Sequence, residues 1–261
     1  MAEPRTYLVG YTNANLDGIQ NYLLDTGQTE FLEDWKEGIA SGLSEGECLI
    51  SMFAKLCYKS LVTGKNENIS KTRSIRENLK GVLASGHGSV FEHVSLNFLT
   101  TNCSRVFTHE LVRHRVGTAF SQTSGRYCAI DESLDIIFPS EYMTTDVKTA
   151  LGEFQRLVVE KARLLQNKLI PPGADFATKK KITSAIRRIA PNGQANEIGW
   201  SANLRTLRHL IELRTSRHAE WEIRLIFNQV ADIVKDKWPM LLHGAETEVI
   251  DGFVEYRKLK V

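Results

Sequence analysis

Cysteine, proline and long apolar runs are scarce in this sequence. Its 261 residues include only four cysteines and six prolines. Cys48, Cys57, Cys103 and Cys128 form no CxxC pair, which disfavours a disulfide framework and a thiolate zinc site. No apolar run has the length of a membrane span, and the N-terminus lacks the pattern of a secretion signal. These absences predict a cytoplasmic protein that has no membrane partner.

An excess of charge of one sign is also lacking. The 33 lysines and arginines nearly balance the 31 acidic residues, so the net charge is +2. A dedicated nucleic-acid scaffold would have a large basic excess, and we therefore expect no nucleic-acid partner. Charged and apolar fractions of 25% and 42% are typical of a globular protein. The order of the expected elements indicates one α+β domain over residues 1–261.

Hydrophobic periodicity predicts three strands and a series of helices. Period-two alternation predicts strands at residues 6–12, 94–100 and 134–139. Helical spacing of apolar residues predicts helices at 47–61, 74–86, 104–116, 146–169, 178–190, 203–214 and 218–238. In the first of these helices, Leu49, Met52, Phe53 and Leu56 are expected to form the buried face. Residues 11–46 are polar and mixed, and we interpret them as an insertion that could be helical from residue 19.

The stretch RHRVGTAFSQTSGRYC, residues 113–128, follows a helix that Ser104 should cap and Gly117 should end. Its cationic groups could hold a metal, a nucleic acid or a phosphate. A metal is disfavoured because His109 and His114 are five residues apart, about 140° around a helix axis. A second basic patch at 179–181, with Arg187 and Arg188, is interpreted as a solvated helix face, because aromatic residues near these cations are sparse.

A phosphate is the ligand that this stretch favours. Ser124, Gly125 and Arg126 place a hydroxyl, an unhindered backbone amide and a guanidinium in succession. Backbone amides and an arginine can share one phosphate group. The sequence TSGRY therefore predicts a compact anion site.

The same residues resemble the signature of the flavin-dependent thymidylate synthases of the ThyX type. In that family an RHR triplet is followed, after seven or eight residues, by a serine such as Ser124. Three further segments are similar in order and spacing: AKLCYKS (54–60), GHGSVFEH (86–93) and NLRTLRHLIELRTSRHAEWEIR (203–224). The resemblance spans residues 50–240. It implies a single domain with a central, mainly antiparallel sheet flanked by long helices.

The resemblance implies reductive methylation at C5 of dUMP, which yields dTMP. Methylenetetrahydrofolate would supply the carbon, FAD would carry the hydride, NADPH would reduce the flavin, and no metal is expected. The cysteines fit this route, because none follows a proline or precedes a histidine as in thymidylate synthases that attack the pyrimidine with a thiol. Without a thiol, a flavin is the suitable electron carrier.

The resemblance also assigns residues. The catalytic residues would be Arg214, against the pyrimidine, and His87, near the flavin and folate. The dUMP-binding residues would be Glu110, Arg113, Gln122, Thr123, Ser124, Gly125, Arg126, Arg187 and Arg214. The FAD-binding residues would be Cys57, Ser89, Arg113, His114, Arg115, Ser121, Gln122, Asn203, His209 and His218. Because arginine stays protonated at pH 7, Arg214 is expected to stabilise negative charge on the ring. The alternative role for Arg214 is a surface ion pair with Glu212 or Glu220.

Several departures from the family pattern leave the substrate open, and Glu110, Ser121 and Gln122 are among them. Eight residues rather than the commoner seven separate Arg115 from Ser124, and His209 stands where asparagine is common. The alternatives are C5-methylation of UMP or another pyrimidine nucleotide, and a nucleotide- or RNA-binding protein without catalysis. The resemblance further implies a homotetramer whose active sites are shared between subunits.

Overall fold

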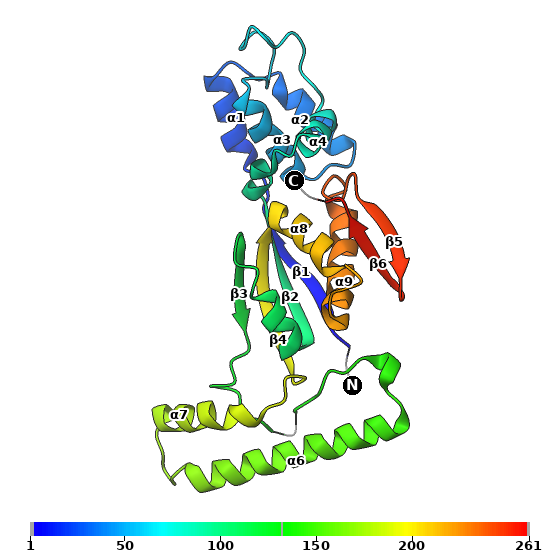
Figure 1. Ribbon diagram of the computed structural model, residues 1–261. Coiled ribbons are helices and arrows are strands. Elements are labelled where there is room, and N and C mark those ends of the chain that lie inside the picture. The colour runs from blue at the N-terminus through cyan, green and yellow to red at the C-terminus, as the bar shows by residue number, and fades with distance from the viewer. Residues whose placement is uncertain (1–2, 132, 260–261) are drawn as a thin grey trace.

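A four-stranded antiparallel sheet forms the centre of the molecule (Figure 1). The computed structural model describes residues 3–131 and 133–259. The sheet order is β1-β2-β4-β3, with bounds Arg5–Tyr11 (β1), Ser95–Ser104 (β2), Thr118–Gln122 (β3) and Ala195–Asn203 (β4). The expected antiparallel α+β architecture is confirmed, as are the strands predicted at 6–12 and 94–100.

The third predicted strand, at residues 134–139, is wrong. This segment contributes only an isolated bridge between Ile136 and Gln194. The sheet is completed instead by β3 and β4. The short strand β3 has small or polar residues at Ala119 and Ser121 and carries little of the usual apolar signal, whereas Ile198, Trp200 and Ala202 of β4 alternate as in a strand and were overlooked.

The inner face of the sheet carries the main core. Phe98 of β2 lies opposite Trp200 of β4, and their rings stack with centroids 4.5 Å apart. This face packs against α8 (Leu204–Arg214) and α9 (Trp221–Lys237). The opposite face, which we call the outer face, leaves Tyr7, Val9 and Leu99 exposed.

The N-terminal helices lie together at one end of the sheet (Figure 1). They are α1 (Leu16–Asp25), α2 (Phe31–Ala40), α3 (Glu45–Cys57) and α4 (Ile75–Ala84). The helical character expected from residue 19 is therefore confirmed, and Leu23 and Phe31 belong to the main core.

The buried face predicted for α3 is wrong in part. Ile50 is fully buried while Leu56 is 44% exposed. The helix packs between neighbours on two sides, and it buries Lys55 against Asp34 of α2 in an ion pair of 2.7 Å. A periodicity argument assumes one apolar stripe, so it cannot identify a helix that buries a paired charge.

The remaining helices and helical turns follow α4 in the chain. The 3-10 helix η1 (Gly88–His93) leads into β2, and Ser104 caps α5 (Arg105–Leu111) as predicted, although α5 ends five residues earlier than expected. The helices α6 (Thr145–Leu169) and α7 (Phe176–Ile186) form a separate layer with its own small core (Figure 1). Two further 3-10 turns are η2 (Ser140–Tyr142) and η3 (Arg187–Ile189).

The chain ends in an antiparallel hairpin that the sequence patterns did not predict. It consists of β5 (Glu246–Ile250) and β6 (Phe253–Arg257), and it lies beside α9 (Figure 1). None of the helices within residues 3–131 and 133–259 combines the length and apolar character needed to cross a membrane.

Candidate active site

Arg214, His114 and Glu110 meet at the end of α8. Arg214 is the last residue of that helix, and its Nε donates to Nε2 of His114 at 2.9 Å. Its Nη1 donates to Oε2 of Glu110 at 2.8 Å. Arg214 lies about a hundred positions from both Glu110 and His114 in the sequence, so only the fold brings it to them. The surface ion pair of Arg214 with Glu212 or Glu220 is not the arrangement found, because Glu110 takes that place.

His114 is neutral in this arrangement. Because the guanidinium of Arg214 is a donor, Nε2 of His114 must accept, and the ring proton lies on Nδ1. Desolvation lowers the pKa of His114 to about 4, with further contributions from the charges of Arg214 and His209. The imidazole is therefore an acceptor at neutral pH and serves to orient Arg214.

A cavity of about 580 Å³ opens beside this cluster. That volume lies in the range of small-molecule sites. It is lined by Glu92, Arg113, His114, Arg115, Val116, Arg205, Thr206, His209, Leu210 and Leu259. Four of the predicted FAD-binding residues, Arg113, His114, Arg115 and His209, thus share one cavity. Its several cationic side chains suit a ligand with phosphate groups.

The turn that carries the RHR triplet is fixed by the start of α8. Gly117 has φ +70°, and a Cβ there would lie 2.3 Å from Nδ2 of Asn203. Asn203 is the N-cap of α8, its Oδ1 accepts from the backbone N–H of Thr206, and its own N–H donates to the carbonyl of Gly117. The predicted FAD ligand Asn203 therefore has a structural role, because it joins the triplet to α8.

Two guanidinium groups converge beside Gly125. A Cβ on this glycine would lie 3.4 Å from Cδ of Arg187 and 3.6 Å from Nη2 of Arg105. Desolvation and the positive charge of Arg187 lower the pKa of Arg105. The turn is closed by Ser124, whose carbonyl accepts from the backbone N–H groups of residues 127 and 128. Two neighbouring arginines and a glycine backbone form a site for an anion.

Sequence reasoning proposed Arg187, Ser124 and Gly125 for a phosphate and did not name Arg105, which the structure places beside them. One signal was present: Arg105 directly follows the N-cap Ser104, at the end of a helix that disfavours cations. A positive charge placed there against the helix dipole suggests that an anion compensates it. Gln122 and Thr123 connect the same region to its surroundings, since Gln122 donates to Thr108 and the N–H of Thr123 donates to the carbonyl of Glu197.

The buried carboxyl group of Glu222 lies near the start of α9 and was also missed. Both oxygens of Glu222 accept from Ser104, Oε1 from its N–H at 2.6 Å and Oε2 from its hydroxyl. Desolvation raises the pKa of Glu222 to about 7, and the charges of Glu220 and Glu110 add to this shift. Glu220 caps α9 and its pKa is raised as well, first by desolvation. The side chain of Glu222 thus joins the start of α9 to the start of α5.

Other predicted residues lie away from the cavity. His87 lines a second cavity of about 390 Å³, where its Nδ1 is 3.5 Å from the hydroxyl of Tyr58. Ser89 and Cys57 are exposed, and Ser121 faces the outer side of the sheet. Arg126 and His218 are exposed too. One chain therefore does not gather all the predicted residues in one pocket.

Metal ligation finds no geometric support in the described chain. Residues 3–131 and 133–259 contain no group of three or more histidine, cysteine, aspartate or glutamate side chains placed to hold an ion.

Comparison with known proteins gives a consistent result. A family model described as thymidylate synthase complementing protein matches residues 40–240. A flavin-dependent thymidylate synthase of Corynebacterium diphtheriae is 30% identical over 230 residues, which cover 85% of this chain and 87% of the relative. A protein of the same name from Clostridium tetani is 31% identical over 79% of this chain and 84% of its own length. A third, from Mycobacteroides abscessus, is 31% identical over 72% and 76%.

Proposed function

Because the chain belongs to the family of flavin-dependent thymidylate synthases, we propose that it converts dUMP to dTMP. Methylenetetrahydrofolate is the carbon donor in this proposal, and NADPH is the reductant. The protein is then a methyltransferase that works through bound FAD. The observation that carries the proposal is the contact of Arg214 with His114 and Glu110 beside a basic cavity.

The residues present fit a flavin dinucleotide. The cavity of about 580 Å³ presents Arg113, Arg115 and Arg205, which suit the two phosphates, and His209, which can donate or accept a hydrogen bond. When bound, FAD would supply the hydride that completes the new methyl group. We assign these four residues and His114 to its binding.

The anion site beside Gly125 is assigned to the nucleotide phosphate. Arg105 and Arg187 supply charge there, and Ser124 with Arg126 completes the turn. Charge-assisted hydrogen bonds from arginine are the strong ones, and a planar guanidinium can bind two phosphate oxygens at once. In this assignment the phosphate holds the nucleotide so that its base lies toward the cluster at Arg214.

Arg214 is assigned an electrostatic role. A guanidinium is a donor without acceptor capacity and stays charged at neutral pH, so it cannot remove a proton. It can stabilise the negative charge that develops on the pyrimidine as C5 becomes nucleophilic. Glu110 and the neutral His114 fix its orientation in advance, so less reorganisation is needed during the reaction.

The complete site is proposed to form between copies of the chain in a homotetramer. His87, Ser89 and Cys57 lie apart from the main cavity, which supports completion by another subunit. The exposed Tyr7 and Leu99 on the outer face of the sheet offer an apolar surface for that contact.

All four cysteines are free thiols, which suits the reducing cytoplasm.

Tritium release tests the proposal. We expect release from C5-labelled dUMP in the presence of methylenetetrahydrofolate, FAD and NADPH, with UMP tested in parallel. Release from UMP alone would assign the protein to another nucleotide methylation, and no release from a protein that holds FAD would refute the proposal. Arg214→Ala is expected to abolish turnover while FAD stays bound, because the cavity cations remain.

A further inference from the structure

A buried arginine ties α8 to the C-terminal segment. Arg208 is only 3% exposed, and its guanidinium donates to three backbone carbonyls. Nε donates to Leu259 at 2.6 Å, Nη2 to His243 at 3.1 Å, and Nη1 to Leu241. Burial lowers the pKa of Arg208 to about 10, so it stays charged at neutral pH. A buried cation here joins two distant parts of the C-terminal segment to one helix.

The last turn of α8 has two more ties to the same segment. Thr215 directly follows Arg214, and its Oγ1 accepts from the N–H of Tyr256 at 3.0 Å while it donates to the carbonyl of Ile211. Glu212 accepts from the N–H of Lys258 at 3.1 Å through Oε1. The hydrogen-bonded backbone of the hairpin is thus held directly beside the residue that contacts His114.

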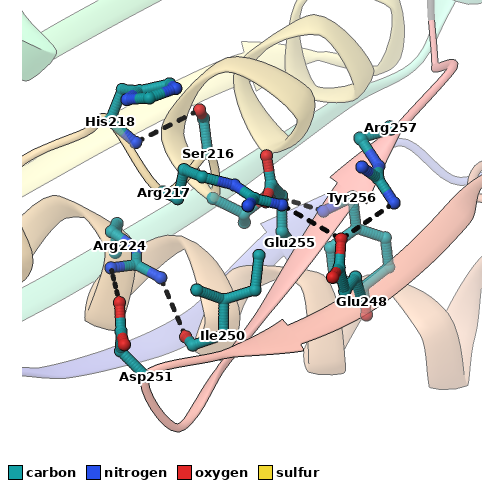
Figure 2. A network of polar contacts seen from close by, with 11 residues as sticks. Ser216, Arg217, His218, Arg224, Glu248, Ile250, Asp251, Glu255, Tyr256 and Arg257 are labelled. Atoms are coloured by element: carbon teal, nitrogen blue, oxygen red, sulfur yellow. Dashed lines mark hydrogen bonds and ion pairs between the residues drawn. The ribbon is translucent and has the colours of Figure 1, made fainter.

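Ion pairs continue this connection past the helix end, as Figure 2 shows. Arg217 binds Oε2 of Glu255 through Nε at 3.0 Å and Oε2 of Glu248 through Nη2 at 3.0 Å. Glu255 is 7% exposed, so the carboxylate of the first pair is buried, while the guanidinium of Arg217 reaches the surface. Arg257 also contacts Glu248, at 3.1 Å. One guanidinium therefore bridges both strands of the hairpin.

We propose that residues 241–259, the C-terminal strap, position Arg214 for the reaction. The strap contacts Arg208 and Thr215 of α8 and its end, and Arg217 in the loop that follows, while Arg214 between them contacts Glu110 and His114. Leu259 also forms part of the cavity wall. The strap lies beyond the region matched by the family model, which ends at residue 240.

Arg217→Gln tests the strap, because it removes both ion pairs and keeps a polar, uncharged side chain. The matched control is Glu246→Gln, which removes the exposed Lys258–Glu246 pair inside the hairpin without touching α8. The first measurement is the pH titration of His114 by NMR of protein labelled at the histidine ring carbons, with the resonance identified by its absence from His114→Gln. It needs no substrate, so it does not depend on the proposed function.

We expect His114 to titrate near pH 4 in the wild type and in the control. In Arg217→Gln its pKa should rise above this value, because a displaced Arg214 no longer repels the protonated ring, while the larger contribution of desolvation remains. Glu248→Gln, which leaves the buried Glu255 pair, should give a smaller rise and serves if Arg217→Gln does not fold. Arg217→Lys, which keeps the charge, should restore part of the effect.

Turnover is the second measurement, and this arm rests on the proposed function. We expect tritium release by Arg217→Gln to fall roughly ten- to hundredfold, as small misplacements of a reacting group do, with FAD retained. If folded Arg217→Gln shows the wild-type titration of His114 and the wild-type turnover, the proposal that the strap positions Arg214 is wrong. A shifted titration with no turnover even in the wild type would support the strap and refute the proposed function.

Discussion

Replacing the buried Glu222 by glutamine should remove a large pH dependence of stability. In the native state both carboxylate oxygens accept from Ser104 in an environment that is 3% exposed. Its pKa is about 7 when folded against a reference value of 4.5. A raised acid pKa means that the native state binds more protons than the unfolded state between these values. The stabilisation is therefore fully present below pH 4.5 and is lost as the pH rises through 7.

The size of this effect follows from the shift. Each pKa unit corresponds to 1.36 kcal/mol, so the carboxylate lowers the free energy of unfolding by about 3 kcal/mol between pH 4.5 and pH 8. Glutamine has the same shape and stays neutral: its oxygen can accept from the N–H of Ser104, and its NH2 can donate to the hydroxyl. Glu222→Gln should therefore gain stability relative to the wild type as the pH rises.

Urea unfolding at a fixed protomer concentration, from pH 4.5 to 8, measures this difference. Glu47 is also buried with a raised pKa, and it contributes the same trend to both proteins, so only the difference between wild type and variant is diagnostic. As a control, Glu77→Gln alters an exposed capping glutamate whose pKa is lowered. Parallel pH curves for wild type and Glu222→Gln would refute the assignment of a neutral buried carboxyl.

Three further predictions address the site. Gly117→Ala should lower the melting temperature well beyond Gly173→Ala, because both glycines have positive φ but only Gly117 has close neighbours among the described atoms. Arg105→Gln should raise the KM for dUMP about tenfold or more and leave the KM for NADPH unchanged, because it removes one of the two guanidinium groups beside Gly125. A KM for dUMP equal to that of the wild type would contradict the anion site. The stabilisation from neutral His114 is present above pH 6.5 and lost as the pH falls through about 4, so urea unfolding should show a smaller acid loss for His114→Gln than for the wild type.

Local signals in the sequence predicted some helix ends. Ser104 caps α5 through a bond from the N–H of Phe107, and the helical pattern after residue 178 ends before Pro191 as predicted. The strand at 94–100 was recognised because Leu96 and Phe98 alternate with outward-facing residues. These features depend on neighbours in the chain, so they can be inferred without the fold.

Features that depend on distant contacts were missed. The strand β3 is short and lies at the edge of the sheet, and only its pairing with β4 makes it a strand. The buried Lys55 in α3 depends on Asp34 of another helix. The hairpin at 246–257 is held to α8 by Thr215 and Arg217, which no local pattern would connect with it.

The sequence by itself determined which chemical groups are available. The hydroxyl, backbone amide and guanidinium of the TSGRY turn indicated a phosphate-bearing ligand through their hydrogen-bonding capacity and charge, which are properties of the residues themselves. The roles expected of the RHR triplet and of Arg214 came from the family resemblance.

Only the tertiary structure decided which of these groups act together. It brought Arg214 against His114, made that histidine neutral by burial, and placed the unpredicted Arg105 beside Arg187. It also placed His87 in a different cavity from the triplet. The physical reason is that pKa values and anion sites arise from the distance between charges and from desolvation, and both are set by contacts between residues far apart in the chain.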